Sequence, residues 1–180
     1  MNIVESSLQE VFGVICWEPK WDINLNLSIN FGQPHLSIRE PKEVKSKYKT
    51  IRQTFRLRGV ALHGEWLFWV LSGYWKLSIK DFGEVTSATR YKRMAMALAR
   101  LDGQKLVHAR VNSDTSATQL DFDLGARLTV RRSSIVGKGD IWSLYKPNGY
   151  VLSVRADGKY HDDPGDSDPK KFRWKPIATS

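Results

Sequence analysis

Two segments of this 180-residue chain repeat the same order of side chains. GEWLFWVLSGYWKLSIKD runs over 64–81, and GDIWSLYKPNGYVLSVRAD runs over 139–157. When Trp66 is aligned with Trp142, apolar residues, glycines and a serine fall into register along both segments. A chain that encodes one unit twice must fold into an architecture that two similar halves can build. This repeat therefore limits the fold more than any other feature.

The similarity extends upstream of these tryptophans. LNLSINFGQPHLSIRE at 25–40 matches TQLDFDLGARLTVRR at 118–132, with a glycine at the same point of each. Four successive segments that agree in the same order indicate an internal duplication of about 8–81 and 101–157. We divide the chain into a first β repeat (8–82, with a basic insert at 41–59), a helical connector (83–100), a second β repeat (101–158) and a polar tail (159–180).

Each repeat has the periodicity of β-strands. In LNLSINF and QLDFDLG every second residue is apolar and the residues between are polar, which is typical of a sheet with one buried and one wet face. Gly32, Gly125, Ser72–Gly73 and Pro147–Gly149 are turn signals. We therefore expect a mainly β protein of duplicated antiparallel meander sheets, packed as a sandwich or a barrel-like pair. The alternation places these side chains and their counterparts in the core: Leu27, Ile29, Leu36, Ile38, Leu77 and Ile79.

One helix is expected at about 87–100, between the repeats. Thr86 or Ser87 can cap its start, a run of Met, Ala and Leu continues it, and Gly103 follows its end. The helix is basic and has no acidic residue within it. It is either a solvated connector or a cationic surface on which a partner docks. Its basic residues are Arg90, Lys92, Arg93 and Arg100.

The chain has a net charge of +9, and much of that charge lies in the insert at 41–59, which the second repeat lacks. Seven lysines and arginines there face a single acid, Glu43, and aromatic residues lie between them. The insert is open to three interpretations: a solvated hairpin whose charges prevent aggregation, a surface for an acidic protein, or a nucleic-acid surface. The candidate partner-binding residues are Lys45, Lys47, Tyr48, Lys49, Arg52, Phe55, Arg56, Arg58 and Trp69.

Trp69 is a candidate because the strand around it is apolar on both faces. WLFWVL is more aromatic than its counterpart WSLYKP in the second repeat. Such a strand is either covered on both sides or partly presented to a ligand or a partner protein.

No catalytic or metal-binding pattern is present in the sequence. His35, His63, His108 and His161 lie on separate segments without ligand spacing, and no nucleophile or phosphate-loop motif occurs. The acidic tail residues lack the spacing of a calcium loop, so we interpret them as a solvated turn. We therefore expect a non-enzyme without metal or cofactor.

The chain has the features of a cytoplasmic protein. It contains no apolar run long enough to span a bilayer, and its first residues lack the pattern of a secretion signal, so no membrane association is expected. Cys16 is its only cysteine, which excludes an internal disulfide and fits a reducing compartment. Within the apolar run GVICW we expect Cys16 to be a small buried side chain.

The second repeat, 101–158, resembles small bacterial all-β immunity-type proteins encoded beside polymorphic toxins. The resemblance rests on the strand and turn FDLGARL, the strand motif Trp-x-Leu at 142–144, and the closing Asp157–Gly158. It implies a cytoplasmic protein that binds and masks a toxin domain, and it transfers no functional residue to this chain. The alternative is a nucleic-acid-binding protein that uses the basic insert.

Overall fold

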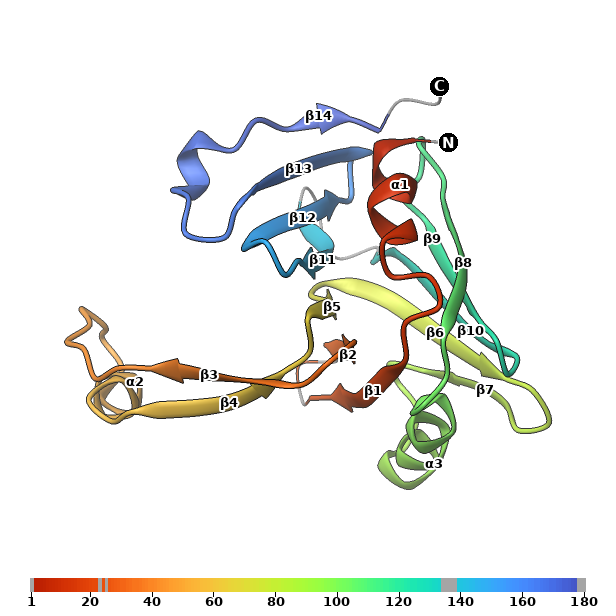
Figure 1. Ribbon diagram of the computed structural model, residues 1–180, viewed down its shortest axis with the longest axis horizontal. Coiled ribbons are helices and arrows are strands. Elements are labelled where there is room, and N and C mark those ends of the chain that lie inside the picture. The colour runs from red at the N-terminus through yellow and green to blue at the C-terminus, as the bar shows by residue number, and fades with distance from the viewer. Residues whose placement is uncertain (1, 23, 25, 134–138, 178–180) are drawn as a thin grey trace.

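The computed structural model describes residues 2–22, 24, 26–133 and 139–177 (Figure 1). Three α-helices lie in this part of the chain: α1 (Ile3–Gln9), α2 (Lys49–Phe55) and α3 (Tyr91–Leu101). The strands of the first half are β1 (Cys16–Trp21), β2 (Leu27–Phe31), β3 (His35–Arg39), β4 (Gly59–His63), β5 (Trp66–Val70), β6 (Gly73–Ile79) and β7 (Gly83–Thr86). Those of the second half are β8 (Leu106–Val111), β9 (Thr118–Phe122), β10 (Ala126–Arg132), β11 (Asp140–Tyr145), β12 (Tyr150–Arg155), β13 (Lys159–Pro164) and β14 (Lys175–Pro176).

The strands form two large antiparallel sheets and a separate two-stranded ribbon. The first sheet has the order β1-β2-β5-β11-β12-β13-β14, the second has the order β7-β6-β10-β9-β8, and β3 pairs only with β4. The mainly β, antiparallel prediction is confirmed, and neither sheet closes into a barrel. Buried residues of both sheets join in one hydrophobic core, so the large sheets are stabilised by the same apolar contacts.

Each large sheet contains strands from both halves of the chain. In the first sheet β1, β2 and β5 continue into β11 and β12, and in the second sheet β8, β9 and β10 continue into β6 and β7. The five strands of the second sheet match the first five of the first sheet in order, and β13 and β14 have no counterpart in the described part of the chain. The halves are therefore related by an approximate twofold exchange. The expectation that each repeat forms its own meander is therefore wrong. The local alternation of a strand does not encode which distant strand it pairs with.

Reciprocal hydrogen bonds mark the place where the two halves meet. The N–H of Gly13 donates to Leu106 O at 2.8 Å, and the N–H of Gly103 donates to Cys16 O at 2.9 Å. Both glycines have positive φ, +79° and +85°, and an antiparallel bridge joins Ile15 to Lys105 between them. Glycine suits this backbone because it adopts positive φ without strain.

The strand register changes the predicted alignment of the tryptophans. Trp142 lies opposite Val70, and Trp75 lies opposite Val130 in the matching position of the other sheet. The structural equivalent of Trp142 is therefore Trp75, not Trp66. The strands β5 and β6 follow each other in the first half, both contain tryptophan, and their apolar residues alternate in a similar way. Only their pairing partners show which of them corresponds to β11.

The predicted hairpin turns are confirmed in the second half and wrong in the first. Gly125 and Gly149, with φ of +88° and +81°, close the β9–β10 and β11–β12 hairpins. Gly32 does not close a hairpin, because β2 and β3 on either side of it belong to different sheets. Ser72–Gly73 is not a hairpin, because the chain there leaves the first sheet after β5 and enters the second with β6.

The helices α1 and α3 each contact an edge strand formed by the other half of the chain. Helix α1 contacts β8 of the second half, whereas α3 contacts β1 of the first half. The predicted connector helix is present as α3, which buries Met94, Ala97, Leu98 and Leu101. It begins after Arg90 rather than at the expected cap Thr86 or Ser87, because β7 extends to Thr86. Helices α1 and α2 were not expected from the sequence. No helix among the described residues is long and apolar enough to cross a membrane.

Candidate partner-binding arm

The ribbon β3–β4 and helix α2 form an arm that extends away from the two large sheets (Figure 1). The arm occupies 32–65, between β2 and β5, whereas the equivalent strands β9 and β10 are joined by only Asp123, Leu124 and Gly125. None of its side chains contributes to the hydrophobic core. The insert at 41–59, which was identified from its charge, is the far end of this longer insertion.

One face of the ribbon carries four exposed aliphatic side chains. Leu36 lies opposite Leu62 and Ile38 lies opposite Val60, so all four share one face. Their exposed fractions are 64%, 47%, 58% and 61%. The prediction that Leu36 and Ile38 are buried is wrong, because their strand pairs within the arm and no other described element covers it. Leu27, Ile29, Leu77 and Ile79 are buried as expected.

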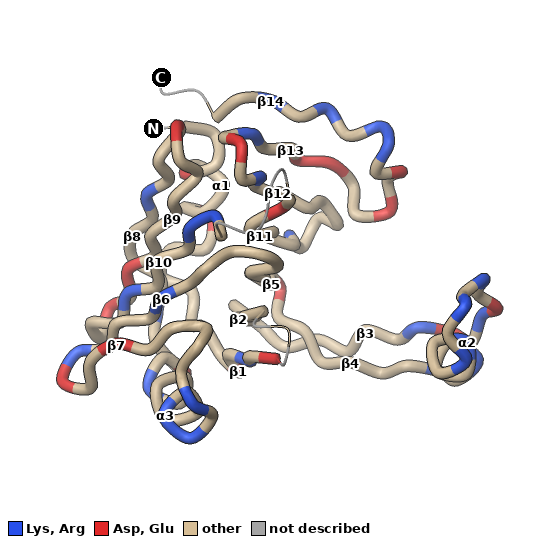
Figure 2. The backbone as a smooth tube through the Cα atoms, turned by 180° about the vertical axis from the view of Figure 1, so that it is seen from behind, with Lys and Arg blue, Asp and Glu red and all other residues tan. Residues whose placement is uncertain are grey.

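The end of the arm is densely cationic (Figure 2). Arg58 forms an ion pair with Glu40 at 2.9 Å, and Arg56 lies 3.8 Å from Glu43. The guanidinium of Arg52 donates to the carbonyl oxygen of Ser46 and thereby fixes the turn before α2. In the described part of the chain three further candidates have no carboxylate partner: Lys45, Lys47 and Lys49. These lysines are the charges available to an acidic surface.

The two aromatic candidates of the arm have different surroundings. The Tyr48 side chain is 56% exposed, and Lys47 Nζ lies 5.0 Å from the centre of its ring. Phe55 is half-buried beneath the Arg39 guanidinium, which lies 4.3 Å from the ring centre. Phe55 therefore packs the end of the arm together, and Tyr48 is the ring that a partner can contact.

Trp69 lies at the root of the arm rather than at its charged end. Its ring is 6.2 Å from that of Tyr145, and both residues line a cavity of about 320 Å³ together with His35, His63 and Leu67. Burial raises the pKa of the Tyr145 hydroxyl, so this ring remains neutral and can donate a hydrogen bond. Trp69 belongs to β5 of the first large sheet, so it lies beside the root of the arm and away from the charged candidates at its end.

A polar cluster beside this cavity was missed by the sequence reasoning. The β12–β13 register places Ser153 opposite His161, and His161 Nδ1 lies 3.1 Å from Asp163 Oδ2. His161 is only 3% exposed because Phe172 stacks on it, with ring centres 4.0 Å apart. The signal in the sequence was His-x-Asp on one face of a strand. These are residue types of a nucleophilic triad, but the Ser153 hydroxyl bonds to Ser143 Oγ at 2.7 Å instead of His161.

The single cysteine is not a reactive thiol at neutral pH. Cys16 is fully buried, as expected, and its Sγ lies 3.1 Å from Leu101 O. Burial raises the pKa of this thiol to about 12. Among the described residues no group of three or more His, Cys, Asp or Glu side chains is placed to hold a metal ion.

Comparison with family models, curated proteins and solved structures found no match to this chain.

Proposed function

We propose that this protein is a non-enzymatic binding protein of the cytoplasm that inserts its arm into an acidic protein partner and masks it. A toxin domain, neutralised in the manner of an immunity protein, is the partner that fits best. The observation that carries this proposal is the exposed aliphatic face of the ribbon directly beside a cationic end. The resemblance of 101–158 to immunity-type proteins supports the same interpretation.

The aliphatic face favours a protein over a nucleic acid as the partner. Binding to nucleic acid relies mainly on cations at phosphates and aromatic rings stacked on bases, and a row of four aliphatic side chains contributes to neither. A protein groove can bury Leu36, Ile38, Val60 and Leu62 together, and each fully buried side chain contributes about 1.5 to 3 kcal/mol before the costs of association. Masking therefore uses the whole arm, whereas nucleic-acid binding uses its end alone.

The two surfaces of the arm have separate roles in this mechanism. The unpaired lysines Lys45, Lys47 and Lys49 steer the arm toward an acidic cleft and fix its orientation, because paired charges act mainly on the rate of encounter. The aliphatic face then desolvates against the cleft and slows dissociation. A narrow arm that fills a catalytic cleft excludes the substrate of that cleft.

Affinity purification from the native host at moderate salt tests the proposal. The matched control is a variant in which 32–65 is replaced by Asp-Leu-Gly, the turn of the other half. One stoichiometric protein that is captured by the full chain and lost by the armless variant supports masking. Nuclease-sensitive material without a protein partner, lost steeply as salt rises, contradicts it and favours the nucleic-acid alternative. A protein partner that the armless variant retains also contradicts it.

A further inference from the structure

The contact between helix α3 and the edge strand β1 differs from the equivalent contact between helix α1 and β8. We call these contacts the α3 seam and the α1 seam. In the α1 seam, Glu5 Oε1 accepts the N–H of Val111 at 2.9 Å, and its Oε2 accepts the N–H of Asn2 at 3.1 Å. The Asn2 amide in turn donates to Val111 O at 3.3 Å. One carboxylate therefore joins the helix to the edge strand and closes that seam.

The twofold relation identifies the equivalent positions in the other seam. Gly13 is equivalent to Gly103, and the buried helix residues align with the same spacing. This alignment places Ala95 where α1 has Glu5, and Ala99 where α1 has Gln9. The buried pairs that fix this alignment are Val4 with Met94, Leu8 with Leu98, and Val11 with Leu101. Two long polar side chains of one helix are therefore methyl groups in the other.

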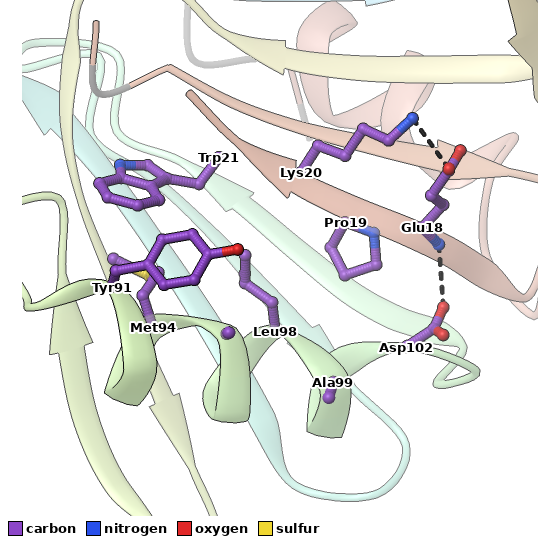
Figure 3. Close-up of a pocket in the computed structure, with 10 residues that line it drawn as sticks. Glu18, Pro19, Lys20, Trp21, Tyr91, Met94, Leu98, Ala99 and Asp102 are labelled. Atoms are coloured by element: carbon purple, nitrogen blue, oxygen red, sulfur yellow. Dashed lines mark hydrogen bonds and ion pairs between the residues drawn. The ribbon is translucent and has the colours of Figure 1, made fainter. Parts of the chain in front are cut away.

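A cavity of about 310 Å³ occupies the space that these alanines leave open (Figure 3). The rings of Trp21 and Tyr91, with centres 6.1 Å apart, form one wall, and Pro19 of β1 lies across from Leu98 of α3. Tyr91 is 74% exposed, so this wall borders solvent. The part of the cavity lined by Met94, Ala95, Leu98 and Ala99 is apolar and suits an aliphatic stem, whereas Glu18, Lys20 and Asp102 line its other end.

A backbone donor at the edge strand lacks the acceptor that its counterpart has. Asp22 N bonds to Asn26 O, so the N–H of the preceding Trp21 points away from β2 and toward α3. Val111, whose neighbour Asn112 bonds to Ala117 O, has the same orientation and donates to Glu5. The described residues provide no acceptor for the Trp21 N–H. The buried indole Nε1 of Trp21 also has no partner among them.

The other end of the cavity already has hydrogen bonds of its own, and Glu18 Oε2 is buried there without a partner among the described residues. The N–H of Glu18, a residue with φ of +50°, donates to Asp102 Oδ1 at 2.9 Å. Lys20 Nζ pairs with Glu18 Oε1 at 2.8 Å and offsets its charge. Among the described residues that line the cavity, Asp102 is then the carboxylate whose charge would repel a bound anion. Helix α3 (Tyr91–Leu101) carries basic residues and no acidic ones. At the Trp21 end of the seam, the unmet requirement is a hydrogen-bond acceptor.

We propose that this seam binds a glutamate side chain of the acidic partner protein, in the position that Glu5 fills in the other half. The aliphatic stem lies over Ala95 and Ala99, and the carboxylate accepts the Trp21 N–H. This inference rests on the proposed masking function for the source of the side chain, but its chemistry can be tested without the partner. It adds a second contact surface, formed by other elements than the arm.

Titration of the ¹⁵N-labelled full chain with N-acetyl-glutamate amide tests the chemistry. We expect the backbone and indole N–H signals of Trp21 to shift in a saturable manner, with a smaller shift for the glutamine analogue and none for the lysine analogue. An unchanged Trp21 signal, or an equal response to the lysine analogue, would overturn the proposal.

Ala95→Glu copies the other helix and supplies the missing acceptor from within the chain. We expect this variant to melt at a higher temperature, to lose the Trp21 response to the probe, and to capture the partner at least tenfold more weakly. Met96→Glu, which adds the same charge to the exposed side of α3, should retain both responses, and Ala95→Gln replaces Ala95→Glu if the latter does not fold. An Ala95→Glu protein that captures the partner normally, while the armless variant does not, overturns the seam proposal and leaves masking intact.

Discussion

Trp75 and Trp142 are equivalent residues of the two large sheets, and each lies opposite a valine of the other half of the chain. Trp75 faces Val130 and Trp142 faces Val70, and both tryptophans are fully buried. The pairing of β6 with β10 and of β5 with β11 therefore crosses between the halves at both positions. Neither half can complete its sheet alone, so we expect the two halves to unfold together.

Replacement of either tryptophan should destabilise the whole protein. We expect Trp75→Ala and Trp142→Ala each to lower the free energy of unfolding by about 3 to 5 kcal/mol, because a large buried ring leaves a cavity. Trp142→Ala also removes the hydrogen bond from its indole to Thr118 Oγ1, at 2.8 Å. Urea unfolding followed by far-UV circular dichroism measures both. Trp69→Ala, at the root of the arm, is the control and should cost less; separate transitions for the two halves would contradict the exchanged fold.

Removal of the arm should leave the two large sheets intact. Replacement of 32–65 by Asp-Leu-Gly joins β2 to β5 with the turn that joins β9 to β10. The melting temperature should change by only a few degrees, because no side chain of the arm belongs to the core. Three hydrogen bonds are altered: from Gly32 N–H to Ile15 O, from Trp17 Nε1 to Gly32 O, and from Gly64 N–H to Asn30 Oδ1. A loss of cooperative melting would show that the arm is required for the fold.

The sequence predicted the local features of this fold, because they depend on near neighbours. The alternation of LNLSINF, the turn glycines Gly125 and Gly149 and the helix near 87–100 are properties of short segments. The pairing of Trp75 with Val130 is not, because segments of similar alternation compete for the same position. Leu36 shows the same limit: its periodicity indicated a strand face, but only the pairing of β3 with β4 shows that the face is uncovered.

The charged end of the arm could be predicted from composition, but the side-chain contacts of the candidate site could not. The excess of lysine and arginine at 41–59 indicated the end of the arm. The sequence could not show that Phe55 lies beneath Arg39, or that Arg58 is paired with Glu40. The cavity at Ala95 was also hidden, because small residues in a helix normally indicate helix propensity alone.

Substitutions at the two surfaces of the arm should affect different rate constants of partner binding. Lys45→Glu, Lys47→Glu and Lys49→Glu together should slow association by about tenfold or more at low salt and reduce its dependence on ionic strength. Leu36→Ser with Leu62→Ser should leave association nearly unchanged and speed dissociation, because buried apolar area holds the complex. Surface plasmon resonance with the captured partner separates the two effects. Equal effects of both sets on association would contradict separate steering and anchoring roles.

The buried thiol of Cys16 should make the protein less stable in alkali. Its pKa is raised from 9.0 to about 12 by burial, so the unfolded chain loses this proton at a lower pH than the folded chain. The stabilisation is complete below pH 9 and is lost as the pH rises toward 12, at up to about 1.4 kcal/mol per pH unit. Urea unfolding between pH 8 and about 10.5 measures this slope, and Cys16→Ala should remove the Cys16 part of it. Tyr145, whose pKa is also raised, adds a slope of the same sign to both proteins. At pH 8 the native thiol should react with a disulfide reagent only as fast as the protein opens, and rapid labelling of the native protein would contradict the burial of Cys16.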